Sequence, residues 1–197
     1  TQINTKAGIT FASGLRSIVR QNPDIIMVGE IRDEETADIE IHASLTGHLL
    51  LSTLHTNDSA SAVPRLLDIG VKPFLLASTL NTVIAQRLVR KICRHCVTSY
   101  EVSPKLKKLI AKDIDIARVG VKSPYKLPTR LFKGAGCSVC GQSGYEGQMA
   151  IFEVLNVDTD VRDLITGASP AEVIRKKAIE NGMVSMFEDG LFKAESG

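Results

Sequence analysis

Two runs of mainly apolar residues, at 25–29 and 49–54, stand on either side of a segment whose apolar positions repeat with helical spacing. The first run is continuously apolar and lies between two acids, Asp24 and Glu30. A short, uninterrupted apolar run is typical of a strand that is buried on both faces of a parallel sheet. The sequence therefore predicts two such strands with a helix between them.

The segment between the two runs carries the start and stop signals of a helix. Asp33 can cap its first turn, and the acids that follow complement the helix dipole. Gly47 is placed to end the helix. Its apolar face is formed by Ala37, Ile41 and Leu45. Strand, helix and strand in this order predict a βαβ unit, and the fold class is α/β.

The rest of the chain predicts mainly helices. Residues 57–59 form a turn and cap before a helix that reaches about Leu67 and ends at Gly70. Residues 73–92 predict one long helix. The further elements expected are a helix at 106–111, an irregular segment at 119–128, a strand at 149–155, and helices at 161–166 and 170–181, the last with a capping box at 169–172.

The composition is that of an ordinary globular protein. Of the 197 residues, 44% are hydrophobic and 23% are charged, and 24 basic against 22 acidic side chains give a net charge of +2. These values argue against a disordered, fibrous or mainly nucleic-acid-binding protein. No apolar run approaches the roughly 20 residues of a transmembrane helix, so we expect a cytoplasmic protein. Because the first residue is Thr1 rather than Met, we expect part of the working protein to precede it.

Charge is distributed unevenly along the chain. Residues 24–40 contain seven acids and one base, whereas residues 69–100 contain five bases and no acid. Such runs are usually the solvated faces of helices. The alternative is a pair of complementary surfaces between neighbouring subunits.

Four cysteines occur as two C-x-x-C pairs, Cys93 with Cys96 and Cys137 with Cys140. Two such knuckles, the second followed by a glycine-rich turn, predict a closed Cys₄ site for a structural Zn²⁺. Two disulfides, unrelated buried thiols or a redox-active pair are the alternatives. Two copies of the motif argue against a redox pair, and a cytosolic location argues against disulfides.

Glu30 and His55 follow the two predicted strands of the βαβ unit. The carboxyl ends of parallel strands are where ligands bind in such units, so these two residues are candidates for chemistry. Phosphate-loop ATPases also place a carboxylate beside Mg²⁺ and the attacking water at the end of a hydrophobic strand. A buried strand that simply ends in an acid is the alternative.

Several segments together resemble the secretion ATPase superfamily, and most closely the hexameric motors of type II secretion and type IV pilus assembly. The resemblance covers nearly the whole chain in order. It is carried by residues 8–16, 26–33, 45–48, 52–57 and 85–90 and by the two cysteine pairs. The related retraction and conjugation ATPases typically lack the cysteine module, which favours the assembly and type II branch.

The resemblance implies roles for individual residues. Residues 25–30 match the Walker B strand, in which Glu30 holds water near Mg²⁺ or serves as general base. His48 and His55 match the histidine box, whose members bind the γ-phosphate or relay the nucleotide state to the adjoining subunit. For each, a hydrogen-bonded core imidazole is the alternative. Arg32 is a candidate for the nucleotide phosphates or for an ion pair with neighbouring acids.

The resemblance also implies the setting in which the protein works. Its cofactors would be ATP and Mg²⁺, with Zn²⁺ as a structural metal. It would form a homo-hexamer in the cytoplasm, at the inner face of the bacterial inner membrane. Its partners there would be an inner-membrane platform protein and the cytoplasmic domain of a membrane-anchored component, and it would bind no nucleic acid.

One departure from the family pattern is large. The sequence contains no G-x-x-x-x-G-K-[ST] phosphate loop and no aspartate box, and we expect both to precede Thr1. The chain would then comprise the carboxyl-terminal part of a RecA-like core (1–92), a tetracysteine zinc subdomain (93–147) and a carboxyl-terminal strand and helices (148–197), and alone it would hydrolyse little ATP. The alternative is a zinc-stabilised, non-catalytic docking module of a membrane-associated assembly.

Overall fold

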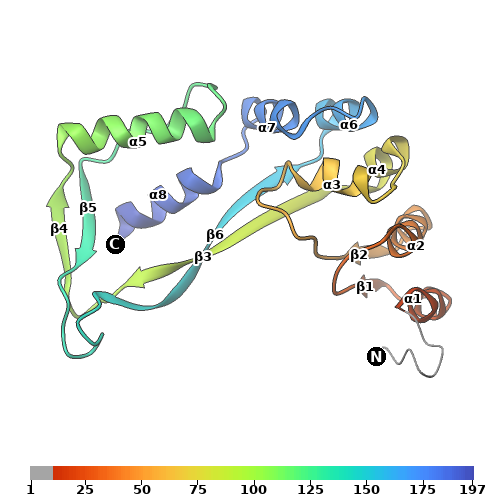
Figure 1. Cartoon of the computed structure of the whole chain (residues 1–197), viewed down its shortest axis with the longest axis horizontal. Coiled ribbons are helices and arrows are strands. Elements are labelled where there is room, and N and C mark those ends of the chain that lie inside the picture. Colours follow the sequence, from red (N-terminus) through yellow and green to blue (C-terminus); the bar gives the residue numbers. More distant parts are fainter. Residues whose placement is uncertain (1–10) are drawn as a thin grey trace. The chain divides into compact units, whose positions relative to one another are not determined.

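The computed structural model describes residues 11–197 (Figure 1), so the start of the 8–16 segment lies outside the described residues. The chain forms two compact units, each built from two stretches of sequence. The first unit contains the described part of residues 1–83 together with 157–174, and the second contains residues 84–156 and 175–197. None of the helices in 11–197 is long and apolar enough to cross a membrane.

The predicted βαβ unit is present in the first unit. Strands β1 (Ile25–Met27) and β2 (Leu49–Leu51) pair in parallel, and helix α2 (Glu34–Leu45) connects them (Figure 1). Helix α1 (Phe11–Val19) packs against α2. The core between them is formed by Leu15, Ile26, Val28 and Ala43.

The caps of α2 are those that the sequence predicted. The Asp33 carboxylate accepts a hydrogen bond from the Thr36 N–H at 2.8 Å. Beyond the other end, Gly47 has a φ of +95°, a conformation that favours glycine because it has no Cβ. Asp33 and Gly47 therefore fix where the helix begins and ends.

The expectation that β1 is buried on both faces is wrong for the described chain. Ile26 is 3% exposed, but its neighbours Ile25 and Met27 are 60% and 69% exposed. β1 and β2 form a two-stranded sheet, and among residues 11–197 the helices cover only the Ile26 face. An apolar run indicates that both faces of a strand can be buried in a core. It does not indicate which segment of the chain covers each face.

Three short helices complete the first unit: α3 (Ala62–Asp68), α4 (Pro73–Thr79) and α6 (Thr159–Thr166). The predicted turn before α3 is confirmed, because the Asp58 carboxylate accepts from the Ser61 N–H at 2.8 Å. The predicted cap at 57–59 is wrong, because the residue that precedes the helix is Ser61 and its side chain makes no capping hydrogen bond. α4 packs against both α2 and α6. The first unit is therefore a set of helices around one parallel strand pair.

The predicted long helix at 73–92 is wrong. Helix α4 ends at Thr79, Leu80 is already extended, and residues Thr82–Ile92 form strand β3. The segment that changes is rich in β-branched side chains, which lose rotamer freedom in a helix and pack well on a sheet. Pairing with β6 (Tyr145–Asn156) decides in favour of the strand.

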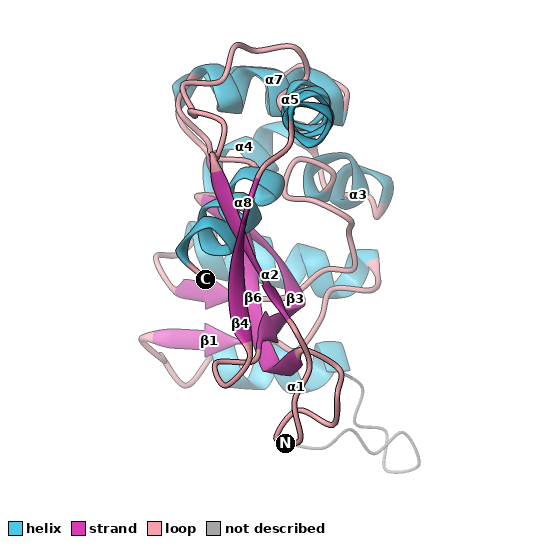
Figure 2. Ribbon diagram, turned by 90° about the vertical axis from the view of Figure 1, so that its left-hand side faces the viewer, coloured by secondary structure: helices cyan, strands magenta, loops and turns pink. Residues whose placement is uncertain are grey.

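The second unit is built on two pairs of strands. β3 and β6 lie side by side as a long ribbon (Figures 1 and 2), and β6 contains the strand predicted at 149–155. Strands β4 (Val97–Glu101) and β5 (Arg130–Gly134) pair in antiparallel register, with Val97 opposite Gly134. Neither β4 nor β5 was predicted from the sequence.

Helices α5 (Pro104–Ala117) and α8 (Met186–Ser196) pack together in the second unit, and α7 (Ala171–Glu180) precedes α8. α5 is longer than the predicted helix at 106–111, and α8 was not predicted. Residues 119–128 are irregular, as expected. The core under these helices consists of Val102, Ile110, Ile114, Leu131 and Leu191.

Candidate functional site

Glu30 and His55 meet at the carboxyl edge of the β1–β2 pair. Glu30 lies three residues beyond the end of β1 and His55 four residues beyond the end of β2. The Nε2 atom of His55 is 3.0 Å from Oε1 of Glu30. The Glu30 side chain is 20% exposed and the His55 side chain is 89% exposed. A partly buried carboxylate therefore contacts an imidazole that faces solvent.

The backbone beyond the two strands holds these residues together. The Val28 N–H donates to the Leu51 carbonyl at 2.8 Å, and the Ile31 N–H donates to the Thr53 carbonyl at 3.1 Å. The Thr53 hydroxyl also donates to the Gly29 carbonyl. The parallel ladder therefore continues past the formal strand ends and fixes Glu30 beside the segment that leads to His55.

Arg32 completes this cluster from the same loop. Its Nε donates to Oε2 of Glu30 at 2.6 Å, so the two carboxylate oxygens contact a guanidinium and an imidazole. Each carboxylate oxygen has two lone pairs, which leaves Glu30 able to accept a hydrogen bond from a further donor such as water. The structure thus places Arg32 in an ion pair with Glu30.

His48 makes its hydrogen bonds at the end of α2. Its Nδ1 is 3.1 Å from the Ala43 carbonyl and 3.0 Å from the Thr46 hydroxyl. These contacts hold the ring against the helix terminus. The structure therefore joins Glu30, Arg32 and His55 directly and places His48 in hydrogen bonds of its own.

Glu40 belongs to this region and was missed by the sequence analysis. It lies on α2, is 3% exposed, and accepts a hydrogen bond from the Ser52 hydroxyl at 3.4 Å. Burial raises the pKa of Glu40 to about 7. The hydrogen bond from Ser52 lowers this pKa and the negative charge of Asp33 raises it, each by less than burial does. The sequence placed the apolar face of this helix on Ala37, Ile41 and Leu45, but that prediction is wrong beyond Ala37. The buried residues of α2 are Thr36, Ala37, Glu40 and Ala43, and Leu45 is 48% exposed.

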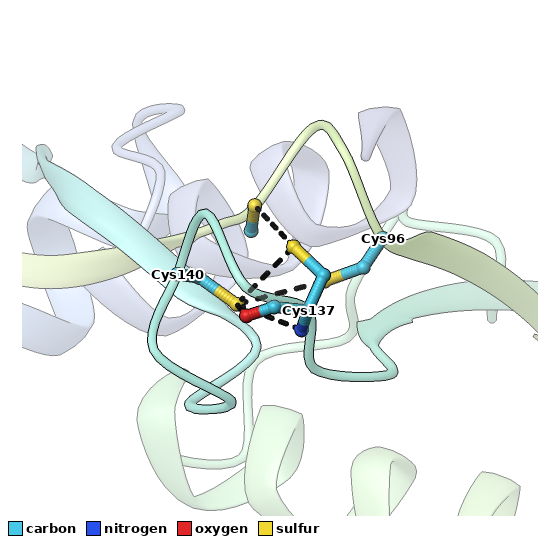
Figure 3. A group of neighbouring side chains, drawn as sticks. Cys96, Cys137 and Cys140 are labelled. Atoms are coloured by element: carbon cyan, nitrogen blue, oxygen red, sulfur yellow. Dashed lines mark hydrogen bonds between the residues drawn. The ribbon is translucent and has the colours of Figure 1, made fainter.

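In the second unit the four cysteines gather at one point, and Figure 3 shows Cys96, Cys137 and Cys140 directed toward one another. All four sulfurs lie within 4.8 Å of one another, and all four are free thiols. Three of the sulfur pairs, Cys137 with Cys140, Cys96 with Cys140 and Cys93 with Cys137, are 3.7, 3.9 and 4.0 Å apart. Four sulfurs around a tetrahedral Zn²⁺ lie about 3.8 Å apart, so the spacing fits a Cys₄ metal site.

The polypeptide prepares Cys140 for the thiolate form that a metal requires. Burial raises the pKa of Cys140, but the N–H groups of Cys137 and Gly144, which donate to its sulfur at 3.3 Å, outweigh burial and lower the pKa to about 6. Burial raises the pKa of Cys93 to about 12. A bound cation would supply the charge that Cys93 needs to ionise.

Tight turns bring the two knuckles together. The Cys93 N–H donates to the Gly144 carbonyl at 3.0 Å, and the Ala135 N–H donates to the Cys96 carbonyl at 2.9 Å. A Cβ on Gly134 would lie 2.0 Å from the Gly144 carbonyl oxygen, so this approach requires glycine. Among the glycines that follow the second cysteine pair, Gly144 has a φ of +75° and donates its N–H to Cys140 Sγ at 3.3 Å, in agreement with the glycine-rich turn that the sequence predicted.

Comparisons with known proteins agree with one another. The family described as "Type II/IV secretion system protein" matches residues 1–197. The chain is 46% identical over its whole length to the type IV pilus assembly ATPase PilB of Thermus thermophilus, covering 21% of that protein. It is 45% identical, again over its whole length, to the type II secretion system ATPase E of Vibrio cholerae, covering 37% of it. The chain thus spans well under half of these relatives.

Two solved structures share the fold. The ATPase DotB of Legionella pneumophila matches 95% of this chain and 39% of its own, with a TM-score of 0.61 and 24% identity. The pilus retraction motor PilT with bound ADP matches 93% of this chain and 43% of its own, with a TM-score of 0.53 and 24% identity. The chain therefore has the predicted RecA-like α/β fold class, and its four cysteines form a cluster.

Proposed function

Because this chain belongs to the type II/IV secretion system protein family, we propose that it is part of a hexameric ATPase. The complete protein would couple ATP hydrolysis to type II protein secretion or type IV pilus assembly, by extracting pilin or pseudopilin from the inner membrane. The isolated chain would hydrolyse little ATP, because its 197 residues contain no phosphate loop.

The observation that carries this proposal is the contact between Glu30 and His55. Their 3.0 Å approach joins the ends of two parallel strands at one edge, where α/β proteins bind ligands. A solvent-facing carboxylate held by an imidazole and a guanidinium suits a group that orients water and accepts its proton. A purely structural ion pair gains little at such an exposed position.

Each residue then has a role in hydrolysis. Glu30 accepts the proton of the attacking water or holds that water in place. His55, through Nε2, orients the Glu30 carboxylate and responds to the bound nucleotide. His48, at the end of α2, also responds to the bound nucleotide. Arg32 neutralises Glu30 or binds a phosphate oxygen. Bound Mg²⁺ with ATP would supply the positive charge that stabilises the phosphates during transfer.

The same family membership supports a proposal for the setting of the motor. We place the homo-hexamer in the cytoplasm at the inner face of the inner membrane. A platform protein of that membrane and the cytoplasmic domain of a membrane-anchored component would be its partners. The names of the relatives, a pilus assembly ATPase and a type II secretion ATPase, support both branches equally.

The cysteine cluster would hold a structural Zn²⁺. Four thiol donors are the ligand set of closed zinc sites, which leave no position for a reacting water. The site therefore stabilises the region around 93–147 and takes no part in hydrolysis.

Phosphate release by the full-length protein with Mg·ATP tests the proposal. Glu30→Gln keeps the size and polarity of the side chain but removes its basicity, so turnover should fall by about 100-fold or more. Circular dichroism should show an unchanged fold.

Glu35→Gln is the matched control. Glu35 is also bonded to an arginine, at 2.9 Å from Arg16, but its side chain is 59% exposed on the solvent side of α2. Its turnover should match the wild type. Undiminished hydrolysis in Glu30→Gln would refute the role of Glu30, and absence of hydrolysis in every protein would favour a zinc-stabilised docking module.

A further inference from the structure

An acid stands on the buried side of the helix that connects the two site-bearing strands. Glu40 shares this side of α2 with Thr36, Ala37 and Ala43, and it is 3% exposed. Acids almost never occupy fully buried positions unless a partner compensates their charge. Glu40 therefore requires a physical explanation beyond helix packing.

The surroundings of Glu40 favour its neutral form. Oε1 accepts the hydrogen bond from Ser52, while Oε2 is buried and has no hydrogen-bond partner among the described residues. The sequences of α4 and β2, which pack on α2, contain no charged residue. On α1, Arg16 bonds to Glu35 instead, and the charge that acts on Glu40 is the negative one of Asp33.

The hydrogen bond that the Glu40 side chain accepts from Ser52 leads to the proposed site. Ser52 directly precedes Thr53, and Thr53 is the residue that bonds to both Gly29 and Ile31 on either side of Glu30. His55 follows two residues later. A displacement of Ser52 would thus be transmitted along the backbone to the contact between His55 and Glu30.

We propose that Glu40, in its neutral form, is a positioning residue: through Ser52 it holds the end of β2 in the arrangement that places His55 against Glu30. Ionisation leaves a buried charge without a cation among the described residues, and the Ser52 segment moves to let water reach the carboxylate. The site is therefore ordered when Glu40 carries its proton and loosened when Glu40 loses it. The consequence for turnover rests on the ATPase function proposed above.

The first test is the pH profile of kcat for the full-length protein. Glu40→Gln keeps the acceptor for Ser52 and removes the charge. The ratio of its kcat to that of the wild type should rise several-fold with increasing pH, with a midpoint near the Glu40 pKa of about 7. Asp38→Asn, which removes an exposed acid of the same helix, should show a constant ratio. Ser52→Ala should lower kcat while leaving KM for Mg·ATP nearly unchanged.

The second test does not need hydrolysis. The Ile31 N–H donates to the Thr53 carbonyl, so hydrogen exchange of the peptide containing Ile31 measures directly whether this hydrogen bond between the two strand ends is intact. At about pH 8 the wild type should exchange faster than Glu40→Gln, and at about pH 6 the two should exchange alike. Asp38→Asn should follow the wild type at both values.

The two tests separate this inference from the proposed function. The exchange difference without any hydrolysis would uphold the positioning role and refute the ATPase. Hydrolysis with the same pH profile and the same exchange in wild type and Glu40→Gln would uphold the ATPase and overturn the positioning role.

Discussion

Two glutamates of the same βαβ unit occupy opposite environments. Glu30 lies at the strand edge with a guanidinium on one oxygen and an imidazole on the other. Glu40 lies inside, with one hydroxyl on one oxygen and no partner for the other among the described residues. Ionised Glu30 is compensated, whereas ionised Glu40 is not. The same side-chain chemistry can therefore serve proton acceptance at one position and structural control at the other.

Glu40 should make stability fall with increasing pH. Its folded-state pKa of about 7 lies above the ordinary value of 4.5, so the folded state binds the proton more tightly than the unfolded state does. Between these values the free energy of unfolding decreases by up to about 3 kcal/mol and is then constant. Urea unfolding of the full-length protein, followed by circular dichroism from about pH 4 to pH 8, should show this decrease. Glu40→Gln should lack it, and an identical slope in that variant would contradict the assignment.

At the scale of elements, predictions from the sequence were right where residues within one segment determine the structure of that segment. α2 was predicted with its caps, because Asp33 and Gly47 lie next to the helix that they begin and end. β3 was not predicted, because its apolar residues also fit a helix and its partner β6 is more than 50 residues away in the chain. Where a distant segment supplies the hydrogen bonds, periodicity within one window does not decide the element.

A buried ion pair joins α5 and α8 in the second unit. Arg118 donates from one nitrogen to both Glu188 oxygens at 3.1 Å, and the two side chains are 7% and 3% exposed. Burial raises the pKa of Glu188, but the bonds from Ser185 and Ser123 and the charge of Arg118 outweigh it and hold the pKa below its ordinary value. This contribution to stability is therefore present at neutral pH and lost as the pH falls through the lowered pKa.

Removing one member of this pair should destabilise the second unit more than removing both charges. Arg118→Met leaves a buried carboxylate without its cation and should cost about 3 kcal/mol in urea unfolding. Adding Glu188→Gln neutralises that carboxylate and should recover part of the loss. Because the chain contains no Trp, circular dichroism is the suitable signal. Lys122→Met, which changes an exposed cation nearby, is the control, and a double variant no more stable than Arg118→Met would contradict the buried-charge argument.

At the scale of the whole molecule, the sequence predicted the parts better than their assembly. The cysteine spacing alone indicated one four-sulfur cluster, because a C-x-x-C pair fixes its own geometry. The Glu30–His55 edge was likewise predicted, because parallel strands end on the same side. The two units were not predicted, since the chain leaves the first unit at 84 and returns to it at 157 before it leaves again at 175. Such returns depend on packing between segments far apart in sequence.

Metal removal should act on one region before it reaches the other. The cysteine cluster lies in the second unit and the Glu30–His55 edge in the first, and without a cation the buried Cys93 remains a neutral thiol. Chelation, or Cys137→Ser, should therefore expose residues 93–147 to limited proteolysis while residues 24–55 stay protected, because structural zinc contributes directly to folding free energy. Ser138→Ala, which lies between the second pair of ligands without altering either, should leave the cleavage pattern unchanged. Simultaneous cleavage of both regions would mean that the cluster stabilises the whole chain and that the proposed boundaries at 92 and 147 are misplaced.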